Sequence, residues 1–189
     1  MYFFLFPLIL GFSFNLASAF TAAYSRRLGA RRGRLITAIL RNVLGIPVWT
    51  LGFGLSARAP APALFPSNLA TNLAGWSLIL IGGGIILAAL FSLRSKAAVP
   101  SMQDGLIQSG LYAHVRNPIH SGTILEFAGL VLLIPTQTVA IACVLGWGWV
   151  WLQTRWDEHD LLQRIPAYRA YMRQVPRFIP HWFIRRNPG

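Results

Sequence analysis

Residues 119–154 read IHSGTILEFAGLVLLIPTQTVAIACVLGWGWVWLQT, a stretch in which Glu126 is the only formally charged side chain. A membrane-spanning helix needs roughly 20 apolar residues, so this stretch is too long for one span. Pro135 lies near its middle and lacks the backbone N–H that a continuing helix needs. The stretch therefore predicts two helices in a tight hairpin, which returns the chain to the membrane face from which it started.

Three further apolar runs precede the hairpin, at residues 2–23, 35–56 and 70–93. The chain is 54% hydrophobic and only 12% charged, about half of the roughly 25% charged residues that are usual in soluble domains. We therefore expect an all-α, polytopic membrane protein with about five transmembrane helices and cytoplasmic C-terminal helices. The whole chain, residues 1–189, is predicted to form a single integral membrane domain.

The basic residues predict the orientation of these helices. The net charge is +12, and the Arg and Lys clusters border the apolar runs, which favours anionic membrane lipids over nucleic acid as their partners. If the N-terminus lies outside, Arg58 is the only one of 17 basic residues on the outer side. We expect a cytoplasmic C-terminus and a bacterial inner membrane. Because arginines follow residues 2–23 and no positive charge precedes them, this run is predicted to be a retained helix.

Two smaller features limit the possible sites. Gly82, Gly83 and Gly84 have no lysine or strand context of a phosphate-binding loop, so they favour close helix packing or a local kink. Cys143 is the only cysteine of the chain, which excludes an internal disulfide and a cysteine-based metal site. We expect Cys143 to be a small buried hydrophobe.

The groups capable of acid–base chemistry lie in the C-terminal half. All five acidic residues and all four histidines follow residue 100. Residues 1–96 are therefore expected to be scaffold helices, and residues 97–189 to carry cofactor binding and catalysis. Two polar segments, residues 110–122 and 155–177, flank the hairpin. Because a hairpin returns its ends to one membrane face, we expect the two segments to meet there and to form one pocket.

The second segment has helical periodicity over residues 157–172, interrupted by Pro166, which predicts two short helices rather than one. Asp157 and Glu158 either lie in the first turn of a new helix or continue the last span. The histidines have no zinc-site spacing, and no G-x-S-x-G motif is present, so neither a metal site nor a hydrolase triad is indicated.

Together the two segments resemble the isoprenylcysteine carboxyl methyltransferase family of integral membrane enzymes and the related phospholipid methyltransferases. That family shows G-x-Y-x-x-x-R-[HN]-P-x-Y-x-G before a helical hairpin, and residues 110–122 read GLYAHVRNPIHSG. After the hairpin it shows E-E-x-x-L, F-G-x-x-Y-x-x-Y and a V-P-R-x-x-P-like close, where this chain reads DEHDLL, IPAYRAY and VPRFIP. The resemblance covers about residues 105–180, with His120, Asp157 and Pro166 in place of the usual Tyr, Glu and Gly.

The resemblance implies S-adenosylmethionine as the cofactor, bound in a cytoplasm-facing pocket, and a lipophilic acceptor that enters sideways between spans. The acceptor would be a prenylcysteine-like carboxylate or a lipid. The cofactor-binding residues that it implies are Tyr112, His114, Arg116, Asn117, Pro118, Glu158, Tyr168 and Tyr171, and the candidate catalytic residues are Glu158, Arg173 and His120. No metal is expected. An amine or alcohol acceptor would need a base, for which Glu158 or a histidine is a candidate.

Several residues keep a second interpretation. Arg116 also fits a headgroup anchor, and Asn117-Pro118 also fits a plain helix start. Glu158 also fits a solvated helix end, and Glu126 is either functional or bonded to a neighbouring helix. Two other functions stay open: an NADPH-dependent membrane reductase of the sterol reductase type, and a non-enzymatic membrane scaffold.

Overall fold

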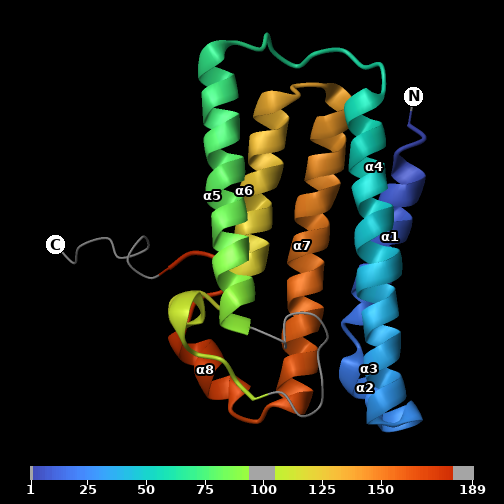
Figure 1. The fold of residues 1–189 in the computed structure, drawn as a ribbon, viewed down its shortest axis with the longest axis vertical. Helices are drawn as coiled ribbons and strands as arrows, with labels where there is room; N and C mark the ends of the chain where they lie inside the picture. Colours follow the sequence, from blue (N-terminus) through green and yellow to red (C-terminus); the bar gives the residue numbers. More distant parts are fainter. Residues whose placement is uncertain (1, 94–104, 181–189) are drawn as a thin grey trace, which may run out of the picture.

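The computed structural model describes residues 2–93 and 105–180. Within these ranges the chain is helical, apart from turns, loops and an isolated antiparallel bridge between Ala63 and Thr136. Figure 1 shows α1, α4, α5, α6 and α7 running along the long axis, with α2, α3 and α8 at one end. The elements are α1 (Leu5–Ser18), α2 (Thr21–Leu28), α3 (Ala30–Ala38), the π-helical turn η1 (Ile39–Gly45), α4 (Ile46–Arg58), α5 (Leu69–Leu93), the 3-10 turn η3 (Gly110–Ala113), α6 (Pro118–Leu133), α7 (Gln137–Arg164) and α8 (Tyr168–Gln174).

Helices α6 and α7 form the predicted hairpin. α6 ends at Leu133 and α7 begins at Gln137, so the turn falls at Pro135 as expected. The side-chain oxygen of Thr136 accepts from the backbone N–H of Val139 at 3.5 Å and caps the new helix. The start of α6 and the end of α7 lie at the same end of the molecule (Figure 1).

Helix α7 continues beyond the apolar stretch. It contains Asp157 and Glu158 and ends only at Arg164, so these residues continue the last helix and do not start a new one. α8 begins at Tyr168, which confirms the predicted interruption at Pro166. Because the helix is unbroken, the charged side chains of its last turns are held in fixed register with its apolar part.

The first apolar run does not form the single helix expected over residues 2–23. α1 and α2 are separate, with a bend of 61° between them. α2 is bonded to a residue that lies far along the chain: the backbone N–H of Ala22 donates to Asp160 Oδ1 on α7 at 2.7 Å. Ala22 is in the first turn of α2, where the backbone N–H groups have no hydrogen-bond partner inside the helix, and the carboxylate of Asp160 supplies one. The acceptor lies far along the chain, so no local pattern reveals the break.

The second apolar run belongs to a continuous helix, Ala30–Arg58, that changes pitch at η1. Pro47 follows η1 in the first turn of α4, inside this continuous helix, where it lacks the backbone N–H of other residues. In the amide orientation that its hydrogen bonds favour, the buried Asn15 of α1 accepts from the indole N–H of Trp49 at 3.0 Å. This contact ties α1 to the helix just after η1.

Helices α5 and α6 touch backbone to backbone at glycines. A Cβ at Gly82 would lie 2.6 Å from the carbonyl oxygen of Gly122, and a Cβ at Gly122 would lie 2.5 Å from that of Gly82. Gly75 and Gly129 make the same reciprocal contact further along, at 3.0 and 2.7 Å. Small residues allow such close approach between helices in lipid. Gly82 therefore serves close helix packing, as the sequence predicted for the triple glycine.

An aromatic core joins the N-terminal helices to the hairpin. Phe12 of α1 stacks on Trp149 of α7 with ring centroids 4.7 Å apart, and Phe53 of α4 stacks on Phe127 of α6 at 4.9 Å. Cys143 is buried in the same cluster, as expected of a small hydrophobe. These contacts place α1 and α4 against the α6–α7 hairpin.

Two helices of the described chain are long and apolar enough to cross a membrane, Ala30–Arg58 and Leu69–Leu93. The bent pair α1–α2 makes a third if it counts as one span, and α6 is an apolar helix of only 16 residues. The apolar helices indicate a membrane protein. The count of five spans stays a prediction.

The two ends of the bundle carry different charge. Arg58 ends α4 beside the α4–α5 connection, whereas Arg26, Arg164 and Arg173 lie in the last turns of α2, α7 and α8 at the opposite end (Figure 1). The positive-inside rule associates the more basic end with the cytoplasm. The orientation in the membrane stays a prediction.

We expect Gly82→Ala to lower the thermal unfolding midpoint of the detergent-purified protein, because the new methyl group meets the backbone of Gly122 and forces α5 away from α6. Overpacking of this kind costs about 1–3 kcal/mol. Gly84→Ala is the matched control, because a Cβ at Gly84 meets nothing within 4 Å. Equal midpoints for the two variants would show that the α5–α6 contact does not depend on Gly82.

Candidate functional site

A buried carboxylate joins the two polar segments of the sequence. Glu158 lies on α7, and its side chain is 3% exposed. Arg116, in the loop before α6, donates from Nε to Glu158 Oε1 at 3.1 Å, and Asn117 donates its side-chain amide to the same oxygen at 2.9 Å. Arg177, after α8, donates from Nη2 to Oε2 at 2.6 Å. The expectation that the two polar segments meet is confirmed.

The loop before α6 is also bonded to the chain after α8 through its backbone. The N–H groups of Arg116 and Asn117 donate to the carbonyl oxygens of Pro176 and Arg177, at 2.8 and 3.1 Å. Nη1 of Arg116 donates to two more backbone carbonyl oxygens of this region, at 2.8 and 2.6 Å. The guanidinium of Arg116 therefore joins three parts of the chain: its own loop before α6, helix α7, and the segment formed by α8 and the residues that follow it.

The arginines keep Glu158 ionised. It lies beyond the apolar part of α7, where burial acts to raise the pKa of its carboxyl. The hydrogen bonds and charges of Arg177 and Arg116 outweigh burial, so this pKa lies below its ordinary value of 4.5. A carboxylate with a low pKa and with both oxygens bonded is a poor proton acceptor. Its surroundings thus suit Glu158 to holding the site together rather than to general base catalysis.

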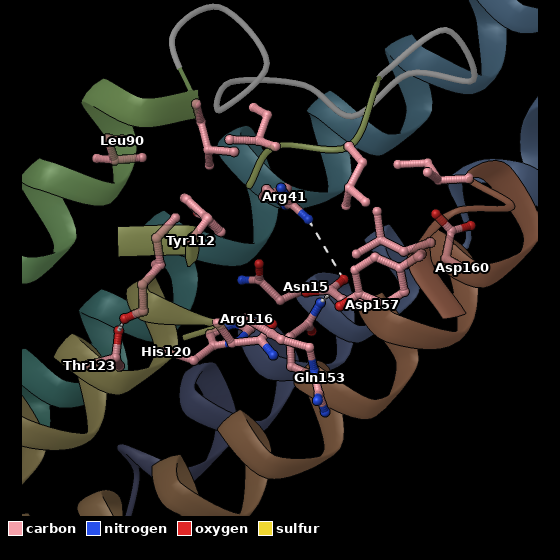
Figure 2. Close-up of a pocket in the computed structure, with 18 of the residues that line it drawn as sticks. Asn15, Arg41, Leu90, Tyr112, Arg116, His120, Thr123, Gln153, Asp157 and Asp160 are labelled. Carbon is pink, nitrogen blue, oxygen red and sulfur yellow. Dashed lines mark hydrogen bonds and ion pairs between the residues drawn. The ribbon is translucent and has the colours of Figure 1, made fainter. Parts of the chain in front are cut away.

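A cavity of about 880 Å³ lies beside this cluster. Leu90 and Phe91 of α5 belong to its apolar side, and Arg41, Gln153 and Asp157 belong to its polar side. Figure 2 shows Leu90 well separated from Arg41 and Asp157, whose ion pair is drawn as a dashed line. The division of the chain into scaffold and catalytic regions stays a prediction, but the cavity wall draws on both halves.

Three tyrosines line the cavity, and all are buried. The hydroxyl of Tyr171 donates to the carbonyl oxygen of Tyr112 at 2.6 Å, and the rings of Tyr168 and Tyr171 lie 5.6 Å apart. Burial raises the pKa of Tyr171 to about 12 and also raises the pKa values of Tyr112 and Tyr168. All three are therefore neutral phenols near neutral pH and present hydroxyl groups rather than charge.

His120 lines the cavity from the start of α6 with one ring nitrogen fixed. Nδ1 lies 2.8 Å from Thr154 Oγ1, and the hydroxyl of Thr154 donates to the carbonyl oxygen of Val150 at 2.7 Å. Thr154 therefore accepts from Nδ1–H, which leaves the lone pair of the neutral imidazole on Nε2. Within the described residues Nε2 has no hydrogen-bond partner, so it can serve a ligand.

Sequence reasoning did not select Arg41, Asp157 or Gln153 for the site. Nη2 of Arg41 lies 3.8 Å from Asp157 Oδ1, and Gln153 donates to the same oxygen at 3.0 Å. Its place in the sequence groups Arg41 with the basic residues that border the apolar runs. The signal that could have found it is its position inside an apolar run, because ionised side chains at such positions usually have a function.

Some predicted residues lie away from the cavity. Glu158 is not part of the lining, and Pro118 is buried as the first residue of α6. His114 and Arg173 are exposed. Glu126 lies deeper along α6, where a Cβ at Gly83 would be 3.5 Å from its carboxyl oxygen. The predicted residues that do line the cavity are Tyr112, Arg116, Asn117, His120, Tyr168 and Tyr171.

Buried polar atoms without a hydrogen-bond partner gather at the cavity. They are the Tyr168 hydroxyl, Gln153 Oε1 and Trp149 Nε1, each unpaired among the described residues. An unsatisfied buried group costs about 1–3 kcal/mol, and all three of these atoms belong to residues that line the cavity. The described residues contain no group of three His, Cys, Asp or Glu side chains arranged to hold a metal ion.

Comparison with known families gives one match. A family model described as phospholipid methyltransferase matches residues 70–169, just over half of the 189-residue chain. The matched segment begins in α5 and ends in α8, so it contains both helices of the hairpin and Glu158. Comparisons with curated proteins and with solved structures gave no match.

We expect Glu158→Ala to destabilise the protein by about 3–5 kcal/mol, because it leaves Arg116 without its buried counter-charge. Chemical unfolding in detergent measures the loss. Asp157→Ala is the comparison, since its side chain is 22% exposed and makes one hydrogen bond with Gln153 and a long ion pair with Arg41, which contributes about 0–1 kcal/mol. Equal losses in the two variants would contradict a central role for Glu158.

Stability should also fall at acid pH through Glu158. Because its pKa is lower in the folded protein than in the unfolded chain, the stabilisation is complete above about pH 4.5 and is lost as the pH falls through the folded pKa. The thermal midpoint of the wild type should therefore drop more steeply below this pH than that of Glu158→Gln. Parallel curves for the two proteins would assign the acid sensitivity to other groups.

Proposed function

Because this chain belongs to the phospholipid methyltransferase family, we propose that it transfers a methyl group from S-adenosylmethionine to a lipophilic acceptor in the membrane. Members of this family are methyltransferases and are related to the isoprenylcysteine carboxyl methyltransferases. One observation carries the proposal. A single cavity beside the two family-like segments combines unpaired buried polar atoms, opposite charges and an apolar wall.

The groups of the wall fit the chemistry of S-adenosylmethionine. Its amino-acid end carries a carboxylate and an ammonium group, which suit a wall with both signs of charge. The Tyr168 hydroxyl and Gln153 Oε1 offer a donor and an acceptor for the ribose or the adenine. Tyr171 and Trp149 add aromatic surface to the same wall. The cavity therefore suits an amphiphilic, charged cofactor.

Bound S-adenosylmethionine would supply an electrophilic methyl group on its sulfonium centre. The protein's contribution to an in-line displacement is mainly orientation and proximity. Arg116 and Glu158 act as positioning residues, because their ion pair holds the loop that carries Tyr112 and Asn117 against α7. Tyr168 and the other cavity-lining groups then meet the cofactor.

The acceptor decides whether the reaction needs a base. A carboxylate is already nucleophilic at neutral pH, whereas an amine or an alcohol has to lose a proton. We assign the base for such an acceptor to His120, whose Nε2 keeps its lone pair because Thr154 accepts from Nδ1–H. His114 and Arg173 are exposed and are not part of the cavity lining, so we assign neither of them a contact with a substrate.

The acceptor would reach the cavity from the lipid. Leu87 and Phe91 of α5 line the cavity and yet are 58% and 79% exposed on the protein surface. Ile46, at the start of α4, also lines the cavity and is 42% exposed on the protein surface. An apolar chain could therefore pass between α5 and α4 without leaving the hydrocarbon layer. This supports the sideways access that the family resemblance implies.

Calorimetric titration of the detergent-solubilised wild type should show binding of S-adenosylmethionine. We expect Tyr168→Phe to weaken binding about tenfold, about 1.4 kcal/mol, because the ligand loses a hydroxyl partner. The thermal midpoint of ligand-free Tyr168→Phe should not fall, because this hydroxyl has no partner among the described residues. A fall in the midpoint together with unchanged affinity would remove Tyr168 from the binding site.

NADPH is the control ligand in the same titration. Binding of NADPH in place of S-adenosylmethionine would favour the membrane reductase, and binding of neither would favour the scaffold. Incubation with a radiolabelled methyl donor and a lipid extract should label the lipid fraction. A label that base releases as methanol indicates a methyl ester, and a label that base does not release as methanol indicates methylation of an amine or an alcohol.

A further inference from the structure

Among the described residues, three arginines line the cavity, and they differ in the hydrogen bonds and ion pairs that their guanidinium groups already make. Arg116 is bonded to Glu158 and to two backbone carbonyl oxygens. Arg164 donates from Nε to Asp160 Oδ2 at 2.7 Å, and both of these side chains are almost fully buried. These two arginines are already neutralised by close carboxylates, so neither is well placed to take the charge of a ligand.

Arg41 differs from the other two. Within the described residues its one recorded partner is Asp157, at an N–O distance of 3.8 Å, which is too long for a hydrogen bond. Its side chain is 23% exposed, and that of Asp157 is 22% exposed. Such an ion pair stabilises the protein by only about 0–1 kcal/mol, so little stability is lost when a ligand breaks it. Arg41 is thus the arginine of the wall that can accept a new anion.

The acidic side of the wall shows the same division. Asp160 is bonded to Arg164 and to the backbone N–H of Ala22. Oδ1 of Asp157 accepts a hydrogen bond from the uncharged amide of Gln153 at 3.0 Å, and Oδ2 has no partner among the described residues. Arg41 of η1 and Asp157 of α7 therefore lie next to each other on the polar side of the cavity, as a loosely joined pair of opposite charges (Figure 2).

We propose that Arg41 and Asp157 form the subsite for the zwitterionic amino-acid end of the methyl donor. Arg41 binds the α-carboxylate, and Asp157 binds the α-ammonium group. The inference rests on the proposed function and adds to it a residue from the N-terminal helices. The fork of a guanidinium matches a carboxylate, and both contacts are charge-assisted. η1 is a π-helical turn of the kind that is frequent at functional sites.

The test is a set of calorimetric titrations on the full-length protein in detergent with three ligands. S-adenosylmethionine carries both charged groups, its decarboxylated analogue lacks only the carboxylate, and methylthioadenosine lacks the whole amino-acid end. Arg41→Gln should weaken binding of S-adenosylmethionine about tenfold, equivalent to 1.4 kcal/mol, and leave the affinity for the other two unchanged. Asp157→Asn should weaken binding of the first two ligands and leave methylthioadenosine unchanged.

Arg34→Gln is the matched control, because Arg34 lies two turns earlier on the same continuous helix, is exposed and is not part of the cavity lining. It should bind all three ligands like the wild type. If Arg41→Gln does not fold, Asp157→Asn tests the subsite alone, through its affinities for the two ligands with an ammonium group and for methylthioadenosine. Thermal midpoints of the ligand-free proteins identify any variant that fails to fold.

Equal affinity of Arg41→Gln and the wild type for S-adenosylmethionine overturns this subsite and leaves the proposed function in place. A uniform loss of affinity for all three ligands also overturns it, because such a loss reflects damage to the cavity rather than recognition of a carboxylate. A wild type that binds none of the three ligands overturns the proposed function and the subsite together.

Discussion

The burial of one ionised carboxylate, that of Glu158, is the constraint on which the site depends. A charge taken out of water is stable only with close partners, and Glu158 takes them from two other segments: Arg116 and Asn117 before α6, and Arg177 after α8. Satisfying the carboxylate therefore requires three parts of the chain to meet. The same requirement gives the cavity a fixed wall, because Tyr112 and Tyr171 lie on the segments that the ion pairs join.

The membrane-type scaffold makes this meeting possible. The turn at Pro135 places the start of α6 and the end of α7 at one end of the molecule. Glycine contacts draw α5 directly against α6, and aromatic stacking holds α1 and α4 against the hairpin. An apolar wall thus continues into polar side chains at one end. A lipophilic acceptor and a charged methyl donor require such a wall if they are to meet in one place.

The polar groups of the site divide by how fully they are bonded. Glu158, Arg116 and Asp160 each make two or more hydrogen bonds, at least one of them to another segment of the chain, and their role is to fix helices and loops. The Tyr168 hydroxyl, Gln153 Oε1 and the loosely paired Arg41 and Asp157 keep capacity for a ligand. This division agrees with a methyl transfer in which orientation supplies most of the catalysis and proton transfer is needed only for some acceptors.

Much of the architecture could be predicted because it depends on short-range patterns. The apolar run with Pro135 predicted the hairpin, and Pro166 predicted the interruption before α8. The hairpin geometry also placed Arg116 beside Glu158. Only the tertiary structure showed that Asp160 is bonded to the start of α2, that Arg41 belongs to the cavity wall and that Glu158 lies outside the lining. The physical reason is distance along the chain. Periodicity and turn residues act between neighbours and leave a visible pattern, whereas the partner of a buried charge can come from any segment that the fold brings near, and no local spacing records it.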